Sequence, residues 1–204
     1  LWSAARRLIG QTWEIRKVTD SNGNVETFAC ERQVTEPKHA TALSAKIAAS
    51  KLLRCVKMTA DLYNLIVFMT NSFIRPTDIK WMQHKHVQIL EGDFTYLRLT
   101  LPSSKKHDKP IVTMPNAVDY YRRQRSLNEE LGLAKPEDYV FMPHFRREKA
   151  EDTEKTIQRR REAALTQLQR QFSVVLEITG LKLGALNEER KLYSLRHTCI
   201  MYRL

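Results

Sequence analysis

Apolar residues recur at steps of three and four between about Ala40 and Phe73. The stripe consists of Leu52, Val56, Ala60, Tyr63, Ile66 and Val67. This spacing predicts one amphipathic helix, because side chains three and four positions apart share a helix face. Asn71 and Ser72 mark its end. Pro76 stands where a first-turn proline is tolerated, so a short second helix is expected from Pro76 to about Gln83.

The apolar period changes to two after this segment. Apolar positions with a central Gly-Asp turn predict an antiparallel hairpin that buries one face: Val87, Ile89, Leu97, Leu99 and Leu101 around Gly92 and Asp93. A polar loop follows from Pro102 to Pro110, and Ile111–Met114 predicts a third strand.

Helical periodicity returns in the second half of the chain. Asn116 can cap a helix that Gly132 ends. A charged stretch over 145–162 continues into amphipathic sequence, which predicts one long helix ended by Gly180 and Gly184. A last helix begins near Ser194.

The expected fold is therefore mainly α with a small three-stranded antiparallel β-sheet, an α+β class. Residues 1–39 are poorly patterned, and their turn signal at 20–24 fits a small hairpin or an irregular loop. We expect this segment to be a linker or an irregular start, and residues 40–204 to form one domain.

The composition indicates a class of binding partner through the net charge of the chain. The chain has 34 Lys and Arg against 23 Asp and Glu, a net charge of +11, which favours a polyanion, most commonly nucleic acid. A basic but unspecialised surface is the alternative. No 18-residue apolar run exists, so no membrane is expected. Three widely spaced cysteines predict no disulfide framework and fit a reducing cytoplasm.

No metal site is expected. His84 and His86 form a His-x-His pair, but no neighbouring residue completes a ligand shell.

The first candidate for chemistry is Arg75, in the segment Asn71–Ile79 at the junction of two helices. A guanidinium beside the first turn of a helix can bind two phosphate oxygens at once. The alternative interpretation is a surface arginine that pairs with Asp78.

The second candidate is the loop between the predicted strands, where Lys105, Lys106 and Lys109 crowd together. Neighbouring cations lower the pKa of a lysine, so that its ammonium group gives up a proton more readily and can serve as a general acid for a leaving alkoxide. The alternative is a solvated basic loop.

The third candidate is Leu192–Thr198, which opens the last helix. Arg196 follows Tyr193 by three residues, so both side chains are expected on one helix face. The alternative for Tyr193 is a core aromatic.

Together these three boxes resemble the catalytic domain of the tyrosine recombinase (phage integrase) family. That family carries an arginine in a Thr-Gly-x-Arg-x-x-Glu context, a lysine in the hairpin of a three-stranded sheet, and a His-x-Leu-Arg-His box. Phe73–Ile79 matches the first box, with Asp78 in place of Glu and Ser72-Phe73 in place of Thr-Gly. Lys106–Ile111 matches the second, although Lys105 fits the lysine position as well. The third is matched by Tyr193–Thr198.

The resemblance implies roles for these residues in DNA integration and recombination by a phage or another mobile element. Arg75 and Arg196 would hold the scissile phosphate, Lys106 would protonate the 5′-oxygen, and Tyr193 would take the place of the first histidine. Asp78 and His197 would support them. The family needs no cofactor or metal and acts on double-stranded DNA as a tetramer, so a homo-tetramer on DNA is expected.

Two departures from the family pattern limit what this chain is expected to do. A phenol at Tyr193 does not exchange protons near neutral pH as an imidazole does. The family's nucleophilic tyrosine lies some tens of residues past the third box, which is outside this sequence, so the nucleophile is unknown. The chain is therefore expected to bind DNA without cutting it.

Two other functions remain open at the sequence level. One is a non-catalytic DNA-binding protein on the same scaffold. The other is an RNA-binding or scaffold protein whose basic loops face solvent, although stacking aromatics are not evident. Further backbone contacts to DNA are expected from Lys105, Lys109 and the basic helix face of Arg122, Arg123 and Arg125, with Arg159 to Arg161 as another candidate.

Overall fold

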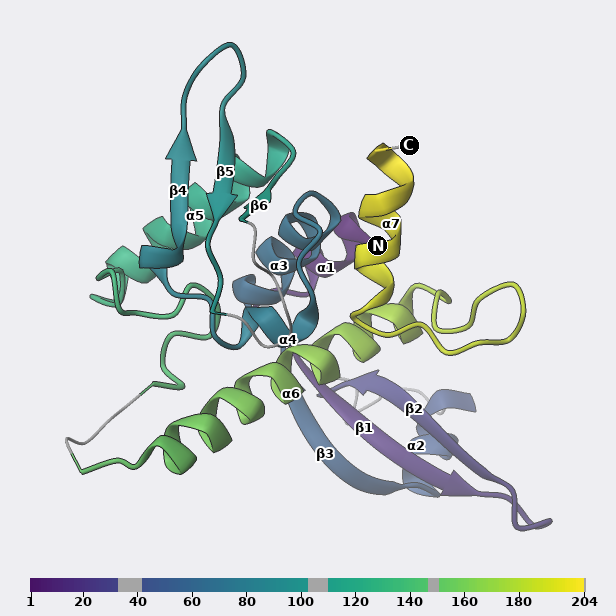
Figure 1. The fold of residues 1–204 in the computed structure, drawn as a ribbon. Coiled ribbons are helices and arrows are strands. Elements are labelled where there is room, and N and C mark those ends of the chain that lie inside the picture. Colours follow the sequence, from purple (N-terminus) through teal and green to yellow (C-terminus); the bar gives the residue numbers. More distant parts are fainter. Residues whose placement is uncertain (33–41, 103–109, 147–150, 204) are drawn as a thin grey trace. The chain divides into compact units, whose positions relative to one another are not determined.

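The computed structural model describes residues 1–32, 42–102, 110–146 and 151–203 (Figure 1). Contacts divide the chain into two compact units. Unit 1 contains residue 1 with 3–60 and 170–190, and unit 2 contains residue 2 with 61–169 and 191–204. The expectation of one recombinase-type domain over 40–204 stays a prediction.

Unit 1 is built on an antiparallel sheet of order β2-β1-β3. Its elements are α1 (Trp2–Arg7), β1 (Thr12–Thr19), β2 (Val25–Glu31), α2 (Ala42–Ala48) and β3 (Lys51–Lys57). The β1–β2 turn follows its sequence signal. The Asp20 carboxylate accepts the backbone N–H groups of Asn22 (2.9 Å) and Asn24 (2.8 Å), and Gly23 has φ +80°. The hairpin that was one of two expectations for residues 20–28 is thus confirmed.

The single helix expected between Ala40 and Phe73 is wrong. Residues Lys51–Lys57 form β3, which separates α2 from α3 (Ala60–Thr70). β3 is an edge strand that leaves all of its residues except Val56 exposed, so it lacks the apolar–polar alternation that identifies a half-buried strand. Leu52 and Val56 of β3 fit a helical spacing only by coincidence.

A small core lies between this sheet and α2. Phe28, Cys30 and Ile47 are buried there, and Val18 packs against them. The last part of α6 (Glu154–Ile178), from Arg170 onward, also belongs to unit 1, where the side-chain amide of Gln171 donates to the backbone carbonyl of Lys57 at 2.7 Å.

Unit 2 contains the sheet that the sequence predicted, with order β4-β5-β6. Its elements are α3, α4 (Pro76–Ile79), the 3-10 turn η2 (His84–His86), β4 (Val87–Leu90), β5 (Tyr96–Leu99), β6 (Ile111–Val112), α5 (Asn116–Glu130), the first part of α6, and α7 (Ser194–Arg203). The fold class is confirmed: the chain is mainly helical, and its described residues include two small antiparallel sheets.

Helix α3 forms the centre of unit 2. Almost every side chain in it is buried, including Leu65, Ile66 and Phe68 at 0% exposure. The Phe68 ring packs edge-on against Phe141 with 5.6 Å between centroids. A helix that is apolar on nearly all sides belongs in a core. None of the helices in the described part of the chain combines the length and apolar composition needed to cross a bilayer.

Arg161, in α6, is buried although it is charged, with 1% of its surface exposed. Its guanidinium donates to the backbone carbonyls of Lys80 (2.6 Å), Met142 (2.8 Å) and Phe141 (2.9 Å), and reaches that of Phe145 at 3.3 Å. It also lies 3.9 Å from the Tyr139 ring centroid. This arginine joins α6 to the chain segments beside α4 and after α5, and it is not available for the DNA contact considered for Arg159 to Arg161.

A buried polar network lies on α3 and α5. The Gln124 amide donates to Asp61 (3.1 Å) and Asn128 (3.0 Å), and the Asp61 carboxylate also accepts the backbone N–H of Met142 (2.7 Å). His84 joins the network at 3.1 Å from the Asn128 side-chain nitrogen and 3.1 Å from the Tyr121 hydroxyl. Because the Asn128 amide nitrogen is a donor, His84 Nε2 accepts and its Nδ1–H donates to Tyr121.

Candidate functional site

The first sequence box lies at the start of α4. Arg75 directly precedes this helix, and its backbone N–H donates to the Asp78 carboxylate at 2.9 Å. Asp78 is buried, so it fixes the backbone at Arg75 as a helix cap does. Two residues earlier, Phe73 has φ +56°, a backbone conformation that favours glycine.

Arg75 lines a cavity of about 680 Å³ that lies wholly within unit 2. We call it the cationic cavity. It is lined by Arg75, Pro76, Thr77, Lys80, Trp81, Gln169, Lys191, Leu192 and Tyr193. Three of these side chains are cations and none is an acid. The first and third sequence boxes therefore meet at one hollow, through Arg75 and Tyr193.

The third box lies at the start of α7. Tyr193 is 45% exposed, and its ring packs edge-on against the His197 ring with 5.1 Å between centroids. The backbone N–H of Arg196 donates to the Tyr193 carbonyl at 3.0 Å. This first helical turn joins Tyr193, Arg196 and His197 into one local structure. Tyr193 is consequently a cavity-lining residue and not a core aromatic.

Arg196 carries the most unusual polar atom in this region. Its Nη1 is buried and has no hydrogen-bond partner among the residues that the structure describes. Across the same described ranges, neither the Arg196 nor the Arg75 guanidinium forms an ion pair with a carboxylate. A buried donor without an acceptor costs about 1–3 kcal/mol, more when it is charged. Such an atom is expected where an anion supplies the acceptor.

The other residues that were predicted to contact DNA are the loop lysines and the arginines of α5. Lys105, Lys106 and Lys109 lie outside the described residues. The basic face of α5 is largely occupied: Arg122 is 3.6 Å from Glu91, and Arg123 stacks on two tyrosine rings. A DNA contact by Arg122 and Arg123 stays a prediction.

Sequence reasoning missed four cavity residues, of which three lie next to the sequence boxes. Lys80 and Trp81 follow the first box directly, and Lys191 directly precedes the third, so extending each box by a few positions would have found them. The Lys80 ammonium lies 5.5 Å from the centroid of the Trp81 ring and 3.6 Å from Glu162. Gln169 carries no comparable signal, because a glutamine on an amphipathic helix is ordinary.

Comparisons of the chain with family models, curated proteins and solved structures found no match. The geometry and chemistry of the cationic cavity are therefore the basis for a functional proposal.

Proposed function

We propose that unit 2 holds the phosphate-binding part of a site that breaks and rejoins double-stranded DNA, as in tyrosine recombinases. The observation that supports this most is that Arg75 and Tyr193, far apart in sequence, line one acid-free cavity. Arg196 is not among the residues that line the cavity, but it lies one turn beyond Tyr193 and its buried Nη1 has no partner among the described residues. Phe73, at the position of the family's glycine, has the backbone conformation that favours glycine.

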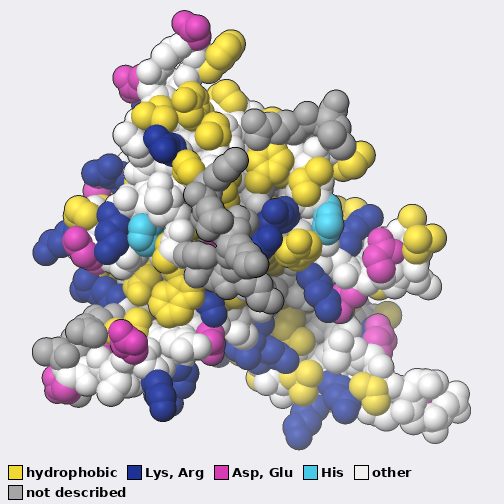
Figure 2. Space-filling model, in the orientation of Figure 1, with side chains coloured by type: hydrophobic (Ala, Val, Ile, Leu, Met, Phe, Trp, Pro, Cys, Tyr) yellow, Lys and Arg dark blue, Asp and Glu magenta, His cyan; other side chains and the backbone are white. Residues whose placement is uncertain are grey.

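A DNA phosphodiester fits this cavity better than a small free anion. The volume of about 680 Å³ lies in the range that takes whole ligands, and it leaves room for a phosphate with an adjoining sugar. The chain's net charge of +11 favours a long polyanion. Lys and Arg side chains are also spread widely over the face drawn in Figure 2.

In the proposed reaction, a tyrosine loses its phenolic proton to water, and its oxygen attacks the scissile phosphorus to form a 3′-phosphotyrosyl bond. The bond from phosphorus to the 5′-oxygen breaks, and Lys106 gives that oxygen its proton. Arg75 and Arg196 stabilise charge on the phosphoryl oxygens, a role worth roughly 10²–10³ in rate for one donor. General acid catalysis by Lys106 contributes about 10²–10⁴. The rejoining step reverses these transfers, so no cofactor is consumed.

The setting of this reaction is part of the proposal. The protein would act in the cytoplasm, on the DNA of a phage or another mobile element, as a homo-tetramer that holds two duplex sites. Asp78 would position Arg75 through its backbone, and His197 would position Tyr193 through ring packing.

Binding by this chain tests the phosphate contact. We expect Arg75→Gln to weaken binding to a 30-base-pair duplex about tenfold near 0.1 M salt, because one phosphate contact is lost. Arg98→Gln is the matched control, since Arg98 is an exposed arginine of unit 2 that lies outside the cavity and outside the predicted DNA contacts. Equal duplex affinities for the two variants would remove the basis of the proposal.

The chemical step needs a chain that includes the nucleophile segment. Such a protein should form a covalent adduct with a nicked duplex, and the adduct should disappear when the nucleophilic tyrosine is changed to Phe. If duplex binding depends on Arg75 but no adduct forms, the protein is a non-catalytic DNA-binding protein on this scaffold. Tyr193 in place of a histidine is the observation that favours this second candidate.

A further inference from the structure

The two faces of the sheet in unit 1 carry charged residues in different arrangements. On the face covered by α2, every described acid of the strands is paired. Glu14 accepts from Arg16, and Glu26 lies 2.7 Å from Lys46 of α2. These residues alternate with the buried Phe28 and Cys30 along the same face, as the antiparallel register requires.

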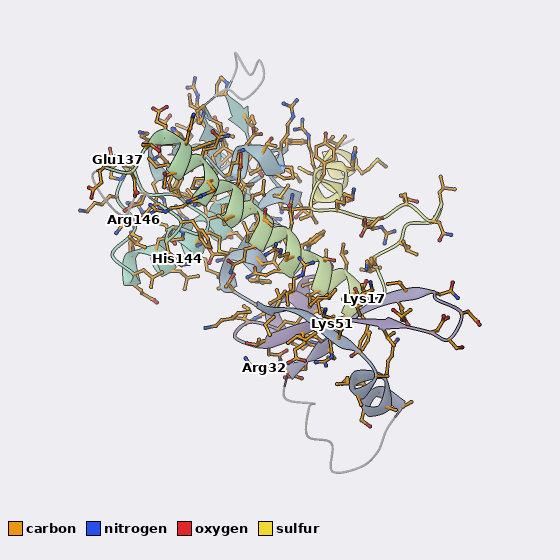
Figure 3. All side chains as sticks on the ribbon, turned by 90° about the horizontal axis from the view of Figure 1, so that it is seen from below. Lys17, Arg32, Lys51, Glu137, His144 and Arg146 are labelled. Atoms are coloured by element: carbon orange, nitrogen blue, oxygen red, sulfur yellow. The ribbon has the colours of Figure 1, made fainter. Side chains whose placement is uncertain are left out.

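The other face carries three cations at one end of the sheet and an acid, Glu31, at the opposite end. Lys17 on β1 pairs directly with Lys51 on β3, and Arg54 pairs with Ile15, two residues before Lys17. Figure 3 shows Lys17 and Lys51 next to each other on neighbouring strands. We call Lys17, Lys51 and Arg54 the basic sheet face. Lys51 and Arg54 are exposed, and Lys17 is half-buried.

The basic sheet face is not neutralised within the described ranges. None of its three cations forms an ion pair with a described residue. Glu31, the acid of β2 on this face, lies opposite Trp13 in the strand register. Trp13 is four residues from Lys17, which corresponds to about 13 Å along the strand. Glu177 is already engaged, since it accepts from the Ala29 backbone N–H and lies 3.2 Å from Lys182.

Like charges directly opposite each other destabilise a sheet. Positively charged residues on an edge strand such as β3 can be explained as protection against aggregation. Lys17 cannot be explained in that way, because it lies on the central strand. An anion that lies over both ammonium groups would offset the repulsion between Lys17 and Lys51.

We propose that the basic sheet face is a second contact for the sugar–phosphate backbone of duplex DNA, separate from the cationic cavity. A polyphosphate backbone supplies closely spaced anions that could lie over Lys17 and Lys51 together and reach Arg54. The nearest aromatic on this face, Trp13, lies at the Glu31 end and is half-buried, so base stacking with single strands is not the mode of binding. The contact reads backbone charge and not sequence.

The test is the salt dependence of duplex binding, with variants on opposite faces of the same sheet. Each lost phosphate contact lowers the slope of log affinity against log salt by about 0.9. We therefore expect the double variant Lys17→Gln/Lys51→Gln to lower the slope by about 1.8, and each single variant to lower it by about 0.9. Lys57→Gln is the matched control, because Lys57 is exposed on β3 but on the other face.

Folding and specificity are measured in the same experiment. The double variant should melt no lower than the unaltered chain, because a like-charge pair is removed. Duplex DNA should raise its melting temperature less than that of the unaltered chain. An unchanged slope, or a loss equal to that of Lys57→Gln, would overturn the proposal. The proposal would also be overturned if the double variant lost binding to polyglutamate but kept its binding to duplex DNA. That result would indicate that the basic sheet face binds an acidic protein.

The salt-dependence test of the basic sheet face can succeed or fail whether or not the proposed reaction takes place. Arg75→Gln tests the cationic cavity and leaves the basic sheet face intact, whereas the lysine variants do the reverse. A slope change in one set alone identifies which of the two contacts exists.

Discussion

Arg161 is a charged side chain that stabilises the interior of unit 2. Burial lowers the pKa of its guanidinium to about 10, so it still carries its charge at neutral pH. The cost of removing this charge from water is offset by hydrogen bonds to four backbone carbonyls and by contact with the face of the Tyr139 ring. The planar, forked shape of arginine makes this possible, since its five N–H donors point in different fixed directions.

Replacing Arg161 by lysine should therefore be costly. An ammonium group has three donors and no fork, so at least one carbonyl would lose its partner. We expect Arg161→Lys to lower the free energy of unfolding by about 3 kcal/mol, as for the loss of charged hydrogen bonds in a core. Urea denaturation measures the change. Arg159→Lys on the exposed side of α6 should have little effect, and equal midpoints for the two variants would contradict the role assigned to Arg161.

His84 makes the stability of unit 2 depend on pH. Burial, with repulsion from Arg125, lowers the pKa of His84 from 6.5 to about 4. The folded state thus binds this proton less readily than the unfolded state, so stability is fully present above pH 6.5 and is lost as pH falls toward 4. The loss amounts to about 3 kcal/mol, at about 1.4 kcal/mol for each pKa unit.

Denaturation curves between pH 7.5 and 4 should show this loss. His84→Gln should flatten the pH dependence, because glutamine does not titrate. Asp61 acts in the opposite sense: burial raises its pKa, so its contribution is present at low pH and is lost as pH rises through that raised pKa. A pH dependence that His84→Gln leaves intact would show that another group causes it.

At the scale of elements, the sequence predicted those parts whose pattern is local. The hairpin of β4 and β5, the helix α5 and the glycine-terminated α6 follow from the apolar period and from the glycines that end the helices. The cap expected at Asn116 is wrong, because Asn116 is already helical and Pro115 precedes the helix without a side-chain cap. β3 was missed because its pairing with β1 is long-range and its residues are exposed on both faces. No local signal distinguishes such a strand from a helix.

The same distinction applies to the candidate site. Arg75, Tyr193 and Arg196 were found because they lie within recognisable boxes, and Arg75 and Tyr193 do line one cavity. The burial of Arg161 was not foreseen, since a run of three arginines on a helix is indistinguishable in sequence from a solvated face. Whether such a side chain points inward depends on carbonyls from distant segments.

The end of α6 gives a prediction for an element. Gly180 has φ +67°, and the N–H of Leu181 donates back to the Leu176 carbonyl at 2.8 Å, which closes the last turn. We expect Gly180→Ala to cost about 1 kcal/mol, because the left-handed conformation strains any side chain. Thermal melting measures it against Gly92→Ala, where φ is not in that region and the space is open. Equal melting temperatures would contradict the prediction.

At the scale of the whole molecule, the two proposed DNA contacts involve different units. Sites that share no interacting residue contribute independently to binding. Combining Arg75→Gln with the Lys17→Gln/Lys51→Gln pair should therefore lower the log–log salt slope by about 2.7, the sum of three contacts at about 0.9 each. Filter binding from 50 to 300 mM salt is suitable. A combined loss no greater than that of the lysine pair would mean that both regions use the same phosphates.

The way the chain is divided has a practical consequence for dissecting the protein. Unit 1 is made from two separate stretches, and helix α6 supplies residues to both units. Cutting away everything before Asp61 would leave Gln171 and Glu177 without the backbone groups they bond to in β3 and β2. Neither unit can be obtained by trimming one terminus, so an excised fragment would need an internal deletion with a designed join.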